Sequence, residues 1–447
     1  MPTFRLAPST LAPLTLALCA ALTAPVYAEN LVSLYQTARD YDAAFQSAKS
    51  QFEATMALSE ESKSNILPTV NLGISGSNGQ ANIIDSTPAQ GNRNFTNQGA
   101  TITASQPLYR PVNLALYEQG KKQALLAPAA LQIAEQDLMI RTSQAYFDVL
   151  GAQDTLTFVQ AQKSAVAEQL ASAKRNFEVG TATITDTREA QARYDLVIAQ
   201  EIAADNDLRV KRLALDQLVG KSNVTPNPLA STALPALMPA DVNPWIAQAL
   251  DTHPTLKQLR VALEVAELEV KKAQAGHKPT LDLTASYGYN DNSNGTTTTA
   301  TTSKSTTGVV GLSFNLPLFG GFFAQNRIKE TLALESKART DLEAGQRNIS
   351  QATRAAYFGV LSGLGQANAL QAAEASSQSA LDANKLGYQV GVRINIDVLN
   401  SQSQLYQTKR DLAKARYDVL VGGLKLRQAN GTLKAEDLQG VNALLSQ

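Results

Sequence analysis

The stretch Ala145-Tyr146-Phe147-Asp148-Val149-Leu150 occurs again, nearly unchanged, as Ala356-Tyr357-Phe358-Gly359-Val360-Leu361. The same spacing of 211 residues relates Val179-Gly180 to Val390-Gly391, Asp186 to Asp397 and Gly220 to Gly431. Self-similarity at one fixed offset indicates an internal duplication. We therefore expect two structural repeats, 29–220 and 242–431, joined by a proline-rich linker at 221–241 and followed by a C-terminal tail at 432–447.

The composition excludes several classes of protein. The chain has 447 residues, and its 39 Lys and Arg are balanced by 39 Asp and Glu. A nucleic-acid-binding protein needs a basic excess, so no nucleic acid is expected as a partner. One Cys and two His nearly exclude thiolate clusters and multi-histidine metal sites. No metal and no cofactor are expected.

Residues 1–28 have the pattern of a signal peptide. The apolar run Leu11 to Leu22 is too short to span a bilayer, and Val26-Tyr27-Ala28 fits a small-x-small cleavage site, so we expect the mature chain to begin at Glu29. Lipidation at Cys19 is the weaker alternative, because Leu18 stands where a small residue is needed. No later apolar stretch is long enough for a transmembrane helix, which leaves a soluble protein or a β-barrel.

Four segments alternate apolar and polar residues, as β-strands do: 69–77, 99–108, 280–290 and 308–318. Each is about ten residues long, the length of a tilted membrane strand. The polar stretches between them, 78–97 and 290–307, are expected to be solvated loops. One side of a soluble sandwich is the alternative, and it is disfavoured because the rest of the chain has helical character.

The helices are expected to be unusually long. Residues 111–179 contain only Pro128 as a strong break, and 322–390 contain no proline, so each would approach about 100 Å at 1.5 Å per residue. Helices at 186–219 and 397–430 complete the repeats. The helix at 397–430 carries an apolar heptad, Val398, Leu405, Leu412, Val419 and Leu426, with small residues three positions after most of them. This pattern is typical of close helix packing, but it also occurs in any coiled coil.

Four strands cannot close a barrel, and open sheet edges are not viable in lipid. If the strands cross a membrane, several copies of the chain must therefore share one barrel. Helices of about 100 Å exceed a hydrocarbon core of about 30 Å, so they would project into a water-filled space, the periplasm for an exported bacterial chain.

The stretch Gly387-Tyr388-Gln389-Val390-Gly391-Val392-Arg393-Ile394-Asn395-Ile396-Asp397-Val398-Leu399 resembles the signature of TolC-type outer-membrane efflux proteins. Ala415-Arg416-Tyr417, Ala192-Arg193-Tyr194 and His253-Pro254 extend the similarity over essentially the whole mature chain. The resemblance implies an α+β membrane protein: a homotrimer with a shared twelve-stranded β-barrel, four strands per chain. A long periplasmic α-helical barrel with a coiled-coil tip would continue it. The similarity is greater to the branch serving type I secretion and drug efflux than to the lipidated outer-membrane factors.

The resemblance also implies a gate at the periplasmic tip, in which Tyr388 and Arg393 would bond Thr185 and Asp186. Asp186 has a local alternative, as the N-cap of a helix with Glu189 three residues on. Asp397 would contribute to a ring of lumen carboxylates that favours cations, or would simply cap the last helix. Many relatives have a second Asp where this chain has Asn400, which should weaken a cation site.

Gly180 and Gly391 are expected at the two hairpin turns, where the backbone takes a positive φ. By resemblance, these tips also receive the hairpins of a periplasmic adaptor (membrane fusion) protein. The implied function is the outer-membrane exit duct of a tripartite export system, which conducts proteins or small toxic molecules. The further implied partners are an inner-membrane ABC or RND-type transporter and outer-membrane lipid. The sequence does not identify the cargo.

An enzyme is not expected. No G-x-S-x-G elbow is present, and Gly220-Lys221-Ser222 is not a phosphate loop because Leu215 stands where that motif needs Gly. His253 and His277 are isolated, with no ligand-spaced partner. The competing hypothesis is a periplasmic helical adaptor or scaffold without a pore, and the four strands are the feature that distinguishes the two.

Overall fold

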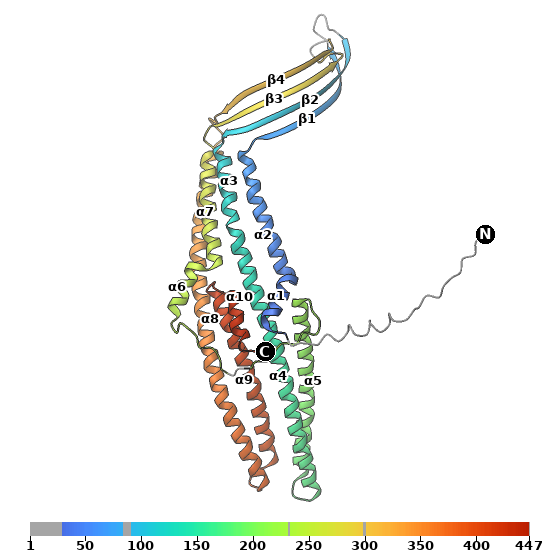
Figure 1. Cartoon of the computed structure of the whole chain (residues 1–447), viewed down its shortest axis with the longest axis vertical. Helices are drawn as coiled ribbons and strands as arrows, with labels where there is room; N and C mark the ends of the chain where they lie inside the picture. The colour runs from blue at the N-terminus through green and yellow to red at the C-terminus, as the bar shows by residue number, and fades with distance from the viewer. Residues whose placement is uncertain (1–28, 84–90, 231–232, 298–300, 447) are drawn as a thin grey trace, which may run out of the picture.

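The computed structural model describes residues 29–83, 91–230, 233–297 and 301–446. The expected signal peptide, 1–28, lies outside them. The described chain is elongated, with a sheet at one end, two helical hairpins at the other and short helices around its middle (Figure 1). This middle zone is called the equator below.

The two repeats share one order of elements, except that the first has an additional 3-10 turn and two consecutive helices where the second has one long helix. The first has α1 (Leu31–Tyr41), α2 (Ala43–Ser62), a 3-10 turn (Lys63–Ile66), β1 (Thr69–Ile83), β2 (Gly91–Tyr109), α3 (Pro111–Ala124), α4 (Leu126–Glu178) and α5 (Ile184–Val219). The second has α6 (Val242–Thr252), α7 (Pro254–Ala275), β3 (Thr280–Ser293), β4 (Ser303–Asn315), α8 (Phe323–Gln389) and α9 (Asn395–Ala429), and α10 (Ala435–Asn442) follows.

The four strands form one antiparallel sheet in the order β1-β2-β3-β4. All four are longer than expected: β1 continues to Ile83, β2 begins at Gly91, β3 continues to Ser293, and β4 has 13 residues. Within the segments expected as loops, residues 78–83, 91–97, 290–293 and 303–307 are therefore paired strand. Apart from Ala81 and Phe95, the side chains placed there are small or polar on both faces. The alternation that marks a half-buried strand therefore stops while the backbone ladder continues. β4 starts earlier than expected, at Ser303, and ends earlier, at Asn315, before Pro317.

The pairing register gathers apolar side chains on one face of the sheet. Leu72 lies opposite Ile102, which lies opposite Tyr287, and Leu283 lies opposite Leu312. The opposite face carries small and polar residues such as Thr101, Ser286 and Gly311. The apolar face, most of whose large members are exposed in the single chain, comprises Val70, Leu72, Ile74, Ala100, Ile102, Ala104, Leu281, Leu283, Ala285, Tyr287, Tyr289, Val310, Leu312 and Phe314.

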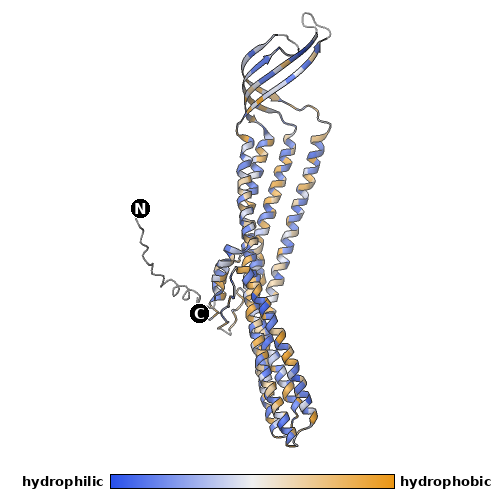
Figure 2. Ribbon diagram, turned by 90° about the vertical axis from the view of Figure 1, so that its right-hand side faces the viewer, coloured by the Kyte–Doolittle hydropathy of each residue, from blue (hydrophilic) through white to orange (hydrophobic). Residues whose placement is uncertain are grey.

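The long helices extend away from the sheet (Figures 1 and 2). α4 has 53 residues and α8 has 67, so they span about 80 and 100 Å at 1.5 Å per residue. The expected interruption by Pro128 is confirmed: α3 ends at Ala124, whose carbonyl would accept from the N–H that Pro128 lacks. Among the described helices, none combines the length and the apolar character needed to cross a bilayer.

The main core lies at the equator, where α1, α4, α5, α9 and α10 meet. Tyr146, Phe147 and Tyr417 pack there against leucines of α1 and α10, and Phe147 stacks on Tyr417 at 5.5 Å. The segment expected as a C-terminal tail, 432–447, is folded as far as Ser446, because Leu433, Leu438 and Leu445 are all buried in this core. The equator thus joins the two repeats.

Candidate functional site at the helical tip

The two hairpin turns lie at the end of the molecule opposite the sheet (Figure 1). Gly180 has φ 79° and Gly391 has φ 80°, and no atom lies within 4 Å of where a Cβ would stand on either. The amide of Thr181 donates to the carbonyl of Asn176 at 2.8 Å, and that of Val392 to Gly387 at 2.9 Å. These bonds close the C-terminal ends of α4 and α8, so the expected turn role of both glycines is confirmed.

Asp186 closes a capping box, but not as the N-cap residue. The N-cap of α5 is Thr183, and Asp186 is the third helical residue, whose Oδ2 accepts from the Thr183 N–H at 2.9 Å and from its hydroxyl at 2.7 Å. The expected pairing of an Asp186 N-cap with Glu189 is wrong, because the backbone becomes extended at Thr183 and the helix begins there.

Asp397 does not cap the last helix either. The N-cap of α9 is Ile394, which makes no side-chain cap bond, and Asp397 lies in the first turn. Its carboxylate lies 3.7 Å from the Arg393 guanidinium. A carboxylate in this position is stabilised by the helix dipole while it stays partly open to solvent.

Within one chain, the expected gate residues each have other partners. The Tyr388 hydroxyl accepts from the Asn176 amide at 3.1 Å, and Thr185 bonds Thr183 at 2.9 Å. Arg393, in the turn that precedes α9, lies 3.7 Å from Asp397 in the first turn of that helix. The structure therefore brings all four residues to one end of the molecule, but it does not join Tyr388 or Arg393 to Thr185 or Asp186 in the same chain.

The contacts that do join the two hairpins near the tip were not expected from the sequence. Asn395, which is 1% exposed, donates to the Asp186 carbonyl at 3.3 Å and accepts from the Gln169 side chain. Arg193 donates to the Asn400 side chain at 2.8 Å. The only sequence signal for Asn395 is that the equivalent position in the first repeat is an apolar residue, Ile184.

A second link between the hairpins lies nearer the equator. The Tyr417 hydroxyl of α9 donates to Asp154 of α4 at 2.6 Å. Burial raises the pKa of Asp154, while the bond from Tyr417 acts in the opposite direction. Burial also raises the pKa of Tyr417 far above its usual value, so this phenol remains a proton donor throughout the physiological range.

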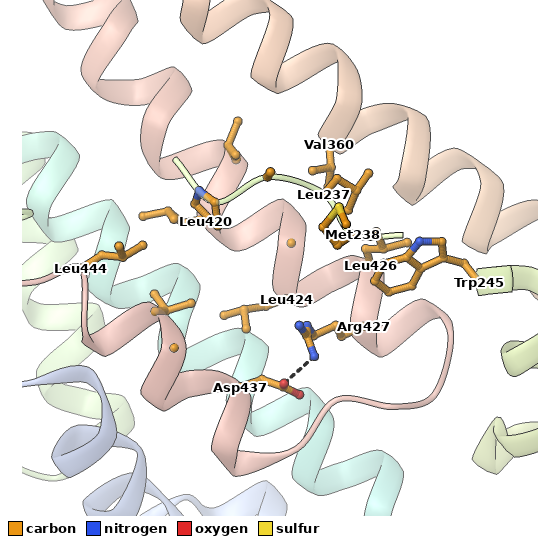
Figure 3. Close-up of a pocket in the computed structure, with 16 residues that line it drawn as sticks. Leu237, Met238, Trp245, Val360, Leu420, Leu424, Leu426, Arg427, Asp437 and Leu444 are labelled. Carbon is orange, nitrogen blue, oxygen red and sulfur yellow. Dashed lines mark hydrogen bonds and ion pairs between the residues drawn. The ribbon is translucent and has the colours of Figure 1, made fainter. Parts of the chain in front are cut away.

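The apolar pocket beside Trp245 offers no reactive group (Figure 3). Its volume is about 260 Å³, and it lies between the linker at Leu237 and helices α9 and α10. Its charged lining residues, Arg427 and Asp437, are already paired at 2.6 Å. His253 caps α7 by accepting from the Thr255 amide at 3.2 Å. No group of three or more metal-binding side chains occurs in the described part of the chain.

An amphipathic four-stranded sheet at one end of very long paired helices is the architecture expected of a membrane channel subunit. The sequence matches the outer membrane efflux protein family over residues 34–221 and again over 245–432, and the chain belongs to that family. Outer membrane protein TolC of Vibrio cholerae is 33% identical over 94% of this chain and 95% of its own length. Alkaline protease secretion protein AprF of Pseudomonas aeruginosa is 30% identical over 93% of this chain and 87% of its own.

Solved structures share the fold. The outer membrane protein VceC of Vibrio cholerae superposes with a TM-score of 0.77 at 18% identity, covering 90% of this chain and 96% of VceC. The CmeC outer membrane channel of Campylobacter jejuni gives 0.77 at 16% identity, covering 100% and 98%. The protein is thus an outer-membrane exit channel of an export system, with its helices extending into the periplasm.

Proposed function

We propose that three copies of this chain assemble one continuous duct through the outer membrane and the periplasm. The observation that carries the proposal is the apolar face that crosses all four strands while β1 and β4 remain edge strands. Open edges are not viable in lipid, so neighbouring chains must pair β1 with β4. Three chains give twelve strands, within the range of closed membrane barrels.

The same assembly explains the helices. At about 100 Å, α8 exceeds a hydrocarbon core of about 30 Å, so the helices of three chains continue the barrel as a hollow periplasmic tube. The tips at Gly180 and Gly391 dock a periplasmic adaptor, and an inner-membrane ABC or RND-type transporter supplies the cargo. Relatives named for protease secretion support a protein cargo, and relatives named for efflux support small toxic molecules.

The duct is gated at its tip. The single chain does not contain the bonds from Tyr388 and Arg393 to Thr185 and Asp186. We propose that they form between neighbouring chains of the trimer. Such exposed bonds are individually weak, so an adaptor that binds the open form better shifts the equilibrium. Three copies of Asp397 form the lumen carboxylate ring, and Asn400 adds no charge to it.

We propose that the mature chain begins at Glu29, after removal of 1–28 as a signal peptide. Glu29 is tied to the linker in two ways: its amide donates to the Thr225 carbonyl at 2.8 Å, and its carboxylate pairs with Lys221 at 2.9 Å. A chain start fixed in this way supports the mature boundary proposed here. N-terminal sequencing of protein purified from outer membranes tests it, and a start within the equatorial core would contradict it.

The first test is the single-channel current of the purified mature protein in a planar bilayer, together with its mass in detergent. A trimeric mass with a small, cation-preferring conductance is the expected result. A monomeric mass without conductance would favour the alternative, a periplasmic scaffold without a pore.

The gate residues are tested by Arg393→Ser and Tyr388→Phe. Each removes one bond that holds the tip closed, so the leak conductance should rise in both variants. Lys385→Ser, on the same helix as Tyr388 but outside the proposed gate, serves as the matched control. Wild-type leak in both gate variants would refute these assignments without affecting the trimeric duct.

A further inference from the structure

The geometry points to Asn395 as a positioning residue that holds the two hairpins of one chain together when the tip is closed. We propose that closure of this tip depends on a buried, uncharged amide within each chain, in addition to the bonds between chains. The proposal rests on the gated duct above. It adds one residue to the gate and predicts that this part of the closure is insensitive to salt.

Asn395 is the first residue of α9, and its side chain joins three helices. Its Nδ2 donates to the Asp186 carbonyl in the first turn of α5 at 3.3 Å, and its Oδ1 accepts from Gln169 of α4. Only 1% of the residue is exposed. A side chain with both amide atoms engaged and almost no solvent contact fixes the start of α9, the second helix of its hairpin, against both helices of the first hairpin.

The bonds of Asn395 are shielded from water. One turn further along α9, Leu399 is fully buried in an apolar cluster with Val166, Val197 and Ala190, which come from both helices of the first hairpin. An amide at the edge of such a cluster cannot exchange its partners for water without opening it. Removing either partner therefore favours separation of the hairpins.

The internal duplication provides a comparison within the chain. The position equivalent to Asn395 in the first repeat is Ile184, the first residue of α5, and it is exposed. The first repeat thus forms the same turn and the same helix start without an amide side chain at this position. The polar side chain of Asn395 is not required by the hairpin turn, and its contacts with the other hairpin account for it.

The neighbouring links between the hairpins also lack ion pairs. Asn176 bonds Tyr388 at 3.1 Å and Arg193 bonds Asn400 at 2.8 Å, so at most one partner in each is charged. Within the described residues, no salt bridge connects the first hairpin, α4 and α5, to the second, α8 and α9. Those between helices of the hairpins stay inside one hairpin. Salt screens ion pairs but barely affects buried amide bonds, so this part of the closure should persist at high ionic strength.

The test uses the full mature chain and two variants, Asn395→Leu and Gln169→Leu, which remove the two sides of one bond. Leak conductance in planar bilayers should rise severalfold in each, at both low and high salt. Because Asn395→Leu already removes the bond to Gln169, the double variant should leak little more than Asn395→Leu alone. Hydrogen exchange of the amides at 395–399 and 186–190 should accelerate in parallel.

Asn384→Leu is the matched control, because Asn384 bonds Ser401 at 2.6 Å within the second hairpin and does not link it to the first. Wild-type conductance and exchange in both Asn395→Leu and Gln169→Leu would overturn the inference, while a leak in Arg393→Ser would still support the gated duct. If no protein conducts, the duct fails, and the exchange data alone decide whether Asn395 holds the hairpins together.

Discussion

Glu269 is the most heavily bonded carboxylate between the sheet and the equator, and it links three helices. It accepts from Gln119 of α3 at 2.9 Å and from Arg327 of α8 at 2.7 Å, and it pairs with Lys272 on its own helix, α7. Burial alone would raise its pKa, but these three partners outweigh burial and lower the pKa to about 2. The charged form is thus the one that the fold stabilises.

Because its pKa is lowered in the folded protein, the contribution of ionised Glu269 to the free energy of unfolding depends on pH. It is complete above the ordinary value of 4.5 and is lost as the pH falls toward 2. Glu269→Gln should therefore lower the thermal unfolding temperature at neutral pH and flatten its decline in acid, as followed by circular dichroism. Glu330→Gln, at the exposed second partner of Arg327, is the control. Parallel acid profiles for wild type and Glu269→Gln would contradict this prediction.

The residue roles that could be predicted from the sequence were those set by the neighbouring residues in the chain. Gly180 and Gly391 follow from the duplication and from the positive φ that a tight turn needs. Asn395 could not be found in this way, because its partners Gln169 and Asp186 are more than 200 positions away. Nothing in the residues next to Asn395 indicates that its side chain is buried.

At the scale of the element, the heptad of α9 was predicted correctly. Val398, Leu405, Leu412, Val419 and Leu426 are all buried, with exposures of 3% or less. The small residue Gly422 admits α8 closely, since a Cβ there would lie 3.3 Å from Val360. Element boundaries were less predictable, because the outer ends of the strands continue by backbone pairing where side-chain alternation has ceased.

Leu412 provides a test of how much the apolar heptad of α9, called the α9 seam below, stabilises the hairpins. Leu412→Ala leaves a cavity among packed helices and should cost about 2–5 kcal/mol in the free energy of unfolding. Leu213→Ala on α5, where the leucine is 67% exposed, is the matched control and should cost far less. Urea unfolding measures both. Equal losses would show that the α9 seam is not part of the stabilising core.

At the scale of the whole molecule, the two repeats keep one architecture but divide its tasks. Both supply two strands and a hairpin, whereas the second has Asn395 and Tyr388 where the first has Ile184 and Phe177. The duplication could be recognised in the sequence because it preserves the turns and the apolar spacing. The different roles of the two repeats could not be predicted, because they depend on how the two hairpins face each other in the folded chain.

The membrane orientation of the sheet is tested by two adjacent valines on opposite faces. Val310 lies near the middle of the apolar face, opposite Ala285, while Val309 lies opposite Ser286 on the polar face. An arginine in contact with the centre of a bilayer costs about 2–4 kcal/mol, whereas one inside an aqueous lumen stays hydrated. Val310→Arg should therefore reduce the yield of protein folded into lipid vesicles.

Val309→Arg should insert normally and shift the ion preference of the conducting duct toward anions, because it adds one positive charge per chain to the lumen. Folding yield is measured by protease resistance in the vesicles, and ion preference by the reversal potential across a salt gradient. If Val309→Arg were the variant that fails to insert, the apolar face would not be the surface that meets lipid, and the shared barrel would have to be abandoned.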